Sequence, residues 1–300
     1  MTLVAFFLLA SSWPPISLAE AGFKDANFVS FHRVGQDLLV VGPADNLVAL
    51  FDADGKLVAR LTKASFGALS SPLPLGVTKE HILLVSNGTQ VQGFDHRLRP
   101  VPHPYKNLPL VMIGSSYIGH GFFLANTYGC GPHAVTILSF DGSWSVIQQL
   151  IPLQYNESKT DVPATPTSWV TVHGKLGFQW VPMEIGAEQY QAQIYDLAEG
   201  AKKPRLVLSH AVGAPEPSGV YWPYLTEAFQ KGDHFLVCLV LANAQTGKVM
   251  ARYLDSFTPE GKFLKRRNMP LSRELRQVYG DQTILCLDNE SMKLKSLSPN

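Results

Sequence analysis

Nearly continuous runs of apolar residues recur along the chain, with turns and alternating segments between them. A strand covered on both faces loses the polar half of its alternation, so such runs predict strands in the middle of sheets. Six runs fit this description, at residues 36–42, 80–88, 121–126, 175–181, 233–240 and 282–288.

A second element follows each run. At residues 51–61 it reads "FDADGKLVARL": an aromatic residue, a tight Asp/Gly turn and an edge strand. Equivalent marker residues before the turn recur about 40 to 60 residues apart, at Phe51, Phe94, Phe140, Tyr195, Phe257 and Leu297. Repeats of this size are typical of propeller blades, which bury their faces by stacking. The pattern predicts an all-β, six-bladed β-propeller of four-stranded antiparallel blades.

The turns fit this prediction. Gly55, Gly142 and Gly261 stand where a hairpin needs a positive φ, whereas the second unit, "DHRLRP", has no glycine. The edge strands carry Lys, Arg or Pro, as in "KLVARLTK" and "RPVPHP". These residues discourage pairing with other molecules.

The sixth unit stops at Asn300, where its edge strand is due. We expect residues 22–28, "GFKDANF", to supply that strand and close the ring. The alternative is a frayed N-terminus and an incomplete sixth blade.

The N-terminus has the features of a secretory signal. An apolar stretch from Leu3 to Ala10 is followed by a Pro pair and by small residues at Ser17/Ala19 or Ala19/Ala21. We therefore expect a signal peptide over residues 1–21, a propeller over 22–300, and export to the periplasm or outside the cell. No apolar run reaches the roughly 20 residues that cross a bilayer, so no transmembrane segment is expected after signal removal. The alternative is that this segment is a buried first strand.

Composition and charge limit the classes of partner that are expected. Lys plus Arg number 25 against 24 Asp plus Glu, and no long basic stripe is present. Nucleic acid is therefore not expected as a partner. A hydrophobic content of 46% with 24 Gly and 21 Pro fits a globular chain with many tight turns.

Residues 62–101 show a Gly-rich connector, a Pro, a "GV" strand, an apolar strand and "VQGFD" before a turn. This segment resembles the repeat of the NHL-like six-bladed propellers of exported bacterial proteins. Within such folds, amidating lyases hold zinc with His from separate blades, and lactonases hold calcium with Glu, Asn and Asp in the tunnel.

Here several inner-strand segments are short of carboxylates, and four His fall at turns opposite the usual mouth: His81, His120, His173 and His234. We expect no cofactor. Calcium or zinc would belong to an alternative, a divalent-metal-dependent hydrolase or lyase with its site in the tunnel.

Nucleophilic chemistry has little support in the sequence. No G-x-S-x-G turn occurs, and Cys130 with His133 is the single pair of interest. Cys238 and Cys286 lie in apolar strand runs, where free Cys behaves as a small hydrophobe. The sequence favours a protein that is not an enzyme.

The long connectors predicted at the mouth combine Tyr and Trp with Asn, Glu and His, a composition enriched in recognition surfaces. We predict non-catalytic binding of a peptide, protein or glycan there, through His103, Tyr105, Tyr128, His133, Tyr155, Tyr221, Trp222, Tyr224 and Arg276. Alternatively, the three aromatic residues at 221–224 plug the ring. Four arginines near the last connector are predicted either to bind an anionic ligand or to form a solvated face: Arg266, Arg267, Arg273 and Arg276. A structural role in a cell-envelope assembly is a third possibility.

Overall fold

The structure of the chain is a computed structural model. It describes residues 13–25, 29–66, 70–87, 89–109, 114–119, 122–126, 133–152, 169–173, 175–180, 183–197, 200–213, 220–281 and 283–297.

The strands form antiparallel sheets in chain order. The first set is β2 (Ser30–Val34), β3 (Asp37–Gly42), β4 (Leu47–Phe51) and β5 (Leu57–Leu61). The second is β6 (Leu73–Val77), β7 (Ile82–Ser86) and β8 (Gln90–Phe94), preceded by a 3-10 turn at Lys63–Phe66. The third is β9 (Gly114–Gly119), β10 (Phe122–Asn126), β11 (His133–Phe140) and β12 (Trp144–Pro152). The fourth is β13 (Trp169–His173), β14 (Leu176–Trp180), β15 (Gln189–Asp196) and β16 (Leu206–Ala211). The fifth is β17 (Tyr221–Lys231), β18 (His234–Asn243), β19 (Val249–Phe257) and β20 (Phe263–Met269).

The two ends of the chain share the last set. It consists of β21 (Arg273–Tyr279), β22 (Ile284–Asp288) and β23 (Lys293–Ser296), with β1 (Ile16–Ser17) paired to β23. A short parallel pairing joins β21 to β2, with Phe31 opposite Val278 and His32 opposite Tyr279. The first and last sets therefore form one eight-stranded sheet.

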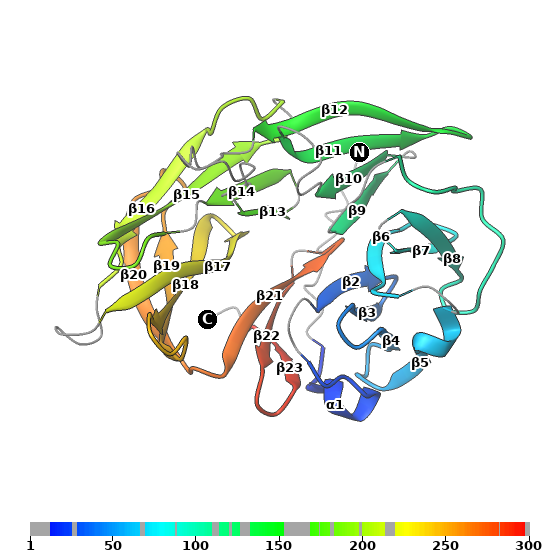
Figure 1. The fold of residues 1–300 in the computed structure, drawn as a ribbon, viewed down its shortest axis with the longest axis horizontal. Coiled ribbons are helices and arrows are strands. Elements are labelled where there is room, and N and C mark those ends of the chain that lie inside the picture. Colours follow the sequence, from blue (N-terminus) through cyan, green and yellow to red (C-terminus); the bar gives the residue numbers. More distant parts are fainter. Residues whose placement is uncertain are drawn as a thin grey trace, which may run out of the picture.

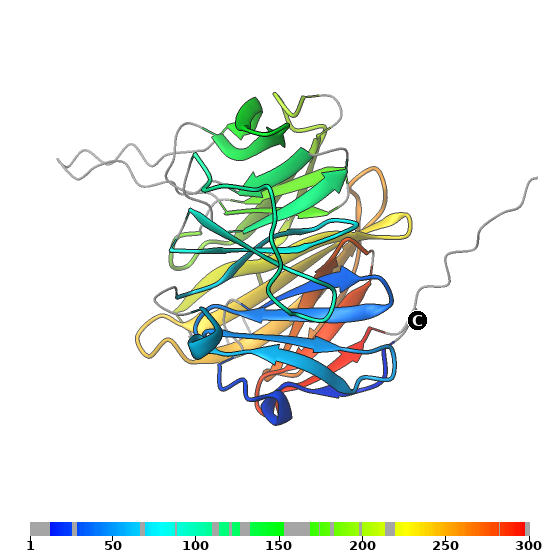
Figure 2. The ribbon, with the colours of Figure 1, turned by 90° about the vertical axis from the view of Figure 1, so that its right-hand side faces the viewer.

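The sheets stand around a common axis, as Figure 1 shows. The first strand of each set lies nearest the centre and the last lies toward the rim. The side view shows neighbouring sheets stacked and twisted against one another (Figure 2). This arrangement is a β-propeller, and the prediction of an all-β propeller is confirmed at that level.

The six apolar runs all become the second strand of their set: β3, β7, β10, β14, β18 and β22. In β3, residues 38–41 are at most 1% exposed. Val41 and Leu39 pack with Ile82 and Leu84 of β7 in a core between the first two sheets. Covering on both faces therefore explains why these strands lack alternation.

The hairpin turns also follow the sequence. Gly55, Gly142 and Gly261 have φ values of 74°, 98° and 82°. In the second set, which lacks the glycine, Leu98 takes the left-handed position with φ of 59° while its side chain stays 4% exposed. Its backbone N–H donates to the Asp95 carbonyl at 3.0 Å, as that of Gly55 does to Asp52 at 2.9 Å.

The second sheet corrects the prediction of four strands in every blade. The segment "RPVPHP" contributes a single bridge, between Phe94 and Pro100, and the sheet has three strands. Proline has no backbone N–H to donate to a ladder, and Pro100, Pro102 and Pro104 alternate through this segment.

The closing strand also lies elsewhere than predicted. Ile16 and Ser17 pair with β23, whereas residues 22–25 form no strand and residues 26–28 lie outside the described part. Between β1 and residues 22–25 lies the four-residue helix α1 (Leu18–Ala21), which ends at Gly22, whose φ is 103°. Ile16 is 1% exposed and faces the buried Leu294, so burial selects this register. No helix in the described ranges is long and apolar enough to span a bilayer.

Candidate functional site

The start of β17 carries three of the predicted binding residues. Tyr221 is 6% exposed and packs in the core between the fourth and fifth sheets. Trp222 is 47% exposed, and its ring lies 5.6 Å from the ring of the half-buried Tyr224 at an angle of 49°. Tyr221 is therefore a packing residue, and Trp222 and Tyr224 form an aromatic pair at the surface.

Two hairpin loops are fastened to this end of β17. The Gly186 N–H donates to the Tyr221 carbonyl at 2.9 Å, and the indole N–H of Trp222 donates to the Met183 carbonyl at 3.2 Å. On the other side, the Ala244 N–H donates to the Val220 carbonyl at 3.1 Å. The loops after β14 and after β18 thus hold β17 from both sides.

These loops and connectors expose large apolar side chains at one end of the fourth to sixth sets. We call this surface the mouth patch, and it consists of Ile185, Val220, Trp222, Met250 and Leu271. Met250 lies two residues from Arg252 on β19, and the Arg252 guanidinium donates through Nε to the Leu271 carbonyl at 2.6 Å. Contiguous exposed apolar groups mark interaction sites more often than isolated ones do, so exposed apolar residues at one end of neighbouring sheets make this surface the candidate.

A buried ionic group lies next to the mouth patch. Glu274 accepts a hydrogen bond from Arg252 at 2.9 Å and another from Arg276, and the Arg252 side chain is 10% exposed. Burial raises the pKa of Tyr224, with Arg252 opposing and Glu274 adding to that shift. Arg276, predicted to bind ligand, therefore has its charge balanced within the protein. Glu274 is not among the residues predicted from the sequence, although its spacing from Arg276 places both on one face of an inner strand.

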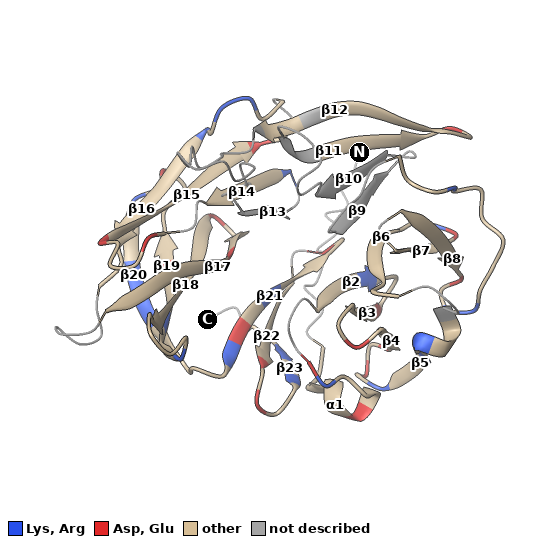
Figure 3. Cartoon of the chain, in the orientation of Figure 1, with Lys and Arg blue, Asp and Glu red and all other residues tan. Residues whose placement is uncertain are grey.

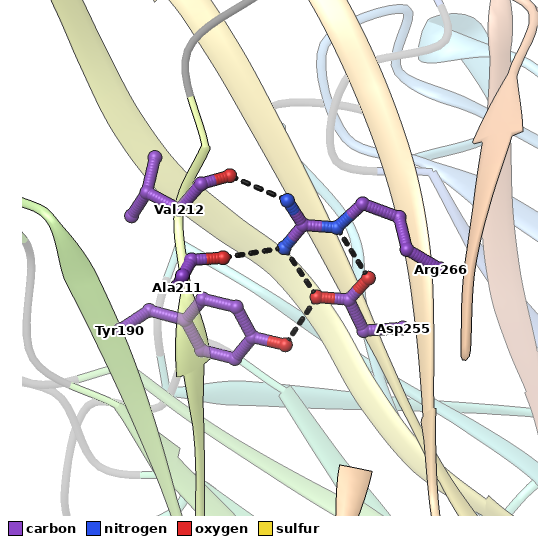
Figure 4. A network of polar contacts seen from close by, with 5 residues as sticks. All are labelled: Tyr190, Ala211, Val212, Asp255 and Arg266. Atoms are coloured by element: carbon purple, nitrogen blue, oxygen red, sulfur yellow. Dashed lines mark hydrogen bonds and ion pairs between the residues drawn. The ribbon is translucent and has the colours of Figure 1, made fainter. Parts of the chain in front are cut away.

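The predicted Arg group is separated into different environments, which corrects that interpretation. Arg266 donates to Asp255 through Nε and through Nη2, each at 2.7 Å, and also to the carbonyls of Val212 and Ala211 (Figure 4). Arg273 lies 3.9 Å from Asp288, and Arg276 contacts Glu274. Figure 3 shows acidic and basic positions distributed around the molecule, with both signs next to each other on β21.

The network around Asp255 ties the fourth sheet to the fifth. Tyr190 of β15 donates its hydroxyl to the fully buried Asp255 carboxylate at 2.5 Å. Burial and the adjacent Asp255 charge raise the pKa of Tyr190, which keeps that hydroxyl protonated as a donor. Burial lowers the pKa of Arg266, but the hydrogen bonds and charge of Asp255 outweigh this effect and raise it overall. The network is therefore a structural clamp between sheets.

His103 and Tyr105 lie in a different cluster. Their rings stack with centroids 6.2 Å apart, and Tyr105 lies 4.8 Å from Phe140 and 6.0 Å from Trp144. The indole of Trp144 donates to the Lys106 carbonyl at 2.9 Å. This connector packs between the second and third sheets, so the structure does not bring its rings together with those of the mouth patch.

Three predicted binding residues remain, and two of them lie outside the described part of the chain. Tyr128 and Tyr155 fall outside the described residues. His133 begins β11, where its backbone pairs with Pro152. The role of all three in binding stays a prediction.

Metal ligands and thiols are the groups in the described residues that bear on catalysis. Among them, no group of three or more His, Cys, Asp or Glu is arranged to hold a metal ion. Burial raises the pKa of the Cys238 and Cys286 thiols. A thiol with a raised pKa is a poor nucleophile at neutral pH because the thiolate is the reactive form.

Comparisons with known proteins agree with the fold. No family model and no curated protein sequence matches the chain. Among solved structures, a member of the DUF4221 family from Bacteroides vulgatus is similar with a TM-score of 0.50 at 9% identity, over 94% of each chain. The WD40 domain of Neurospora crassa Pan2 has a TM-score of 0.47 at 10% identity, over 97% of each chain. At these identities the likeness concerns the fold alone.

Proposed function

We propose that this protein is a non-catalytic binding protein that recognises a protein segment through the mouth patch. The observation that carries the proposal is the exposure of Trp222, together with that of Val220 and Ile185 in the adjoining segments, at a place where hydrogen bonds hold the loops. Rigid aromatic side chains give large contact area at low entropy cost. The proposal therefore assigns Trp222 the role of central anchor.

The chemistry of the patch favours a peptide or protein over a glycan. The indole N–H of Trp222 is already donated to Met183, so its exposed part offers mainly an apolar ring. Ile185, in the loop bonded to Trp222, and Val220, two residues before it, are aliphatic, as is Leu271 of the same patch. Sugar recognition needs several convergent polar groups, whereas an apolar patch with a polar rim suits a protein partner.

The test is selection of peptides from a random phage-displayed library on the purified protein. We expect enrichment of sequences with apolar or aromatic anchors. Replacing a hot-spot Trp costs about 2 kcal/mol or more, which is about 30-fold in Kd, so Trp222→Ala is expected to weaken these peptides by that factor. Val146→Ala, at an exposed apolar position on the rim strand β12, is the matched control and should leave binding unchanged. Equal binding to the Trp222 variant, or selective binding on a glycan array instead, would overturn the proposal.

We also propose that the ring has six blades of the NHL-like type and that the protein is exported. The six sets of strands support the count when the eight-stranded sheet is taken as two blades. A crystal structure with a different number of blades would refute it. Export is tested by fractionating cells that express the full chain, and recovery in the cytoplasm alone would contradict it.

We propose that binding needs no cofactor. The test is metal analysis of protein purified without chelator, together with a lactonase and esterase assay. We expect neither stoichiometric metal nor turnover. Stoichiometric calcium or zinc that is lost together with activity would establish the metal-dependent hydrolase instead.

A further inference from the structure

The rim strand β20 carries three consecutive cations, which strand alternation divides between the two faces of the fifth sheet. Arg266 points toward the fourth sheet, where it donates to the Ala211 carbonyl at 2.7 Å. Lys265 and Arg267 take the opposite face together with Met269, which packs against the core between the fifth and sixth sets. Both cations therefore face the sixth set, and both are exposed.

The sixth set turns two lysines toward the same core. In β23, Leu294 packs with residues of the first sheet, so Lys293 and Lys295 take the face toward the fifth sheet. Lys295 lies opposite Cys286, which packs against that core. Burial raises the pKa of the Cys286 thiol, and the charges of Arg273 and Lys295 oppose this shift, as expected for neighbours on one face. Lys293 and Lys295 are both exposed.

Together these exposed side chains form a surface that we call the basic rim: Lys265, Arg267, Lys293 and Lys295. Figure 3 shows basic positions on both strands that carry it, β20 and β23. Within the described part of the chain, none of the four forms an ion pair with a carboxylate. Burial lowers the pKa of Lys231, and the nearby charge of Arg267 lowers it further. The basic rim therefore has a positive potential that an anionic partner would neutralise.

The outer edge of β20 is also open to pairing. Among the described strands, β20 pairs with β19 alone, so alternate backbone N–H and C=O groups along its outer edge have no strand partner. Cations on an edge strand discourage pairing with most segments. An acidic segment removes that barrier, because opposite charges across a strand pair attract.

We propose that β20 and the basic rim bind an extended acidic segment of a protein partner, which adds to the fifth sheet as a further strand. Side chains two residues apart on one face of a strand are separated by about 7 Å. Acidic side chains at alternate positions of the segment would therefore lie beside Lys265 and Arg267. Lys293 and Lys295 add positive charge from the facing side of the sixth set.

Other anionic partners fit these features less well. Nucleic-acid binding rests on contacts to many phosphates, whereas the basic rim has four cations and the whole chain has a net charge of +1. A lipid surface offers negative charge but no amide groups that could pair with the edge of β20. An extended peptide satisfies both the charges and the edge.

The test is fluorescence anisotropy of a labelled peptide in which Glu alternates with Thr, titrated with the purified full chain. We expect binding that weakens as the NaCl concentration rises from about 50 to about 500 mM, because exposed charges are screened. Equal binding of the same peptide with Gln in place of Glu, or with N-methylated amides that cannot pair, would overturn the proposal. Tighter binding of oligo-dT or of phosphatidylserine vesicles would also overturn it.

Variants locate the site. Lys265→Gln/Arg267→Gln should weaken peptide binding about 5-fold, since it removes two pairs of opposite charges across the strands. Lys56→Gln/Arg60→Gln is the matched control, with two exposed cations at the rim strand β5 of the first set, and should change Kd less than about 2-fold. Equal effects of the two double variants, or the reverse order, refute the assignment.

The role of the sixth set is tested by a further pair of substitutions. Adding Lys293→Gln and Lys295→Gln to the β20 variant should weaken the peptide again, and no further loss would remove the sixth set from the site. Trp222→Ala should leave binding of this peptide unchanged, because Trp222 lies outside the basic rim. Failure of the mouth patch to bind its own ligand therefore does not affect this result.

Hydrogen exchange gives a readout of the added strand itself. Saturating Glu-Thr peptide should slow exchange of the outward-facing β20 amides and leave those of β5 unchanged, because new backbone hydrogen bonds form only at β20. Peptide binding without added protection of β20 would contradict strand addition.

Discussion

Removing the Arg266 guanidinium tests the clamp between the fourth and fifth sheets. In Arg266→Met, Asp255 keeps the Tyr190 hydroxyl as a donor but loses two hydrogen bonds and its opposite charge. Removing one partner of a buried ion pair costs about 3–5 kcal/mol, because the other charge stays buried. The Arg266 side chain is 20% exposed, so water can reach the site and we expect the lower end, about 3 kcal/mol.

The assay is equilibrium unfolding in urea, with the slope compared between variants to detect changes in the unfolded state. Arg273→Met is the matched control. Its partner Asp288 lies 3.9 Å away, and their side chains are 48% and 29% exposed. Exposed pairs of this kind contribute about 0–1 kcal/mol.

A second substitution identifies the cause of the loss. Asp255→Asn in the Arg266→Met background removes the stranded charge, so the double variant should be more stable than Arg266→Met alone. Similar small losses for Arg266→Met and Arg273→Met, or a double variant less stable than either single one, would refute the reasoning.

Three further predictions concern local packing. Burial lowers the pKa of His32 to about 3 from 6.5, so below pH 6.5 the unfolded chain binds a proton that the folded chain does not. The free energy of unfolding should therefore fall by about 1.4 kcal/mol per pH unit from pH 6.5 toward 3. Urea unfolding of His32→Phe at several pH values should show a smaller fall per pH unit. Leu98→Gly should be more stable than Leu98→Ala by about 1 kcal/mol, because both lose the buried side chain but glycine removes the strain of the positive φ. The reverse order in urea unfolding would contradict the turn assignment. Gly93→Ala would place a Cβ 2.6 Å from His103 and should cost about 1–3 kcal/mol; His103→Ala should reduce this loss, and a Gly93→Ala variant of unchanged stability would contradict the packing.

The sequence was sufficient to predict the repeating core. Apolar runs without alternation became the second strands because neighbouring sheets cover both their faces, a condition that the residue pattern records directly. The hairpin glycines were predictable for the same reason, since a positive φ is a local requirement. Leu98 shows the limit of this reasoning, because tertiary packing holds it in a conformation that its own type disfavours.

The candidate site was less predictable because it depends on contacts between sheets. The aromatic composition indicated Trp222, but the position of its ring is fixed by a hydrogen bond to Met183, in a loop of another sheet. The pairing of Arg266 with Asp255 follows from hairpin register, whereas the contact with Tyr190 needs the next sheet in place. The location of β1 depended on which apolar residues match β23, and the small residues nearby suggested a cleavage site there instead.

Closure of the ring by the two ends of the chain is the central claim, and a disulfide between β1 and β23 tests it most directly. Ser17 and Lys293 are opposite each other in the antiparallel pair, and opposite residues in such a pair lie about 4.5–5.5 Å apart at Cα, within reach of a disulfide. In Ser17→Cys/Lys293→Cys, peptide mapping after mild oxidation should find residues 17 and 293 linked. The control Ser17→Cys/Lys265→Cys, with its second thiol on β20 of another sheet, should show no link. Free thiols at 17 and 293 in folded protein, or an equal yield of the control link, would contradict the closure.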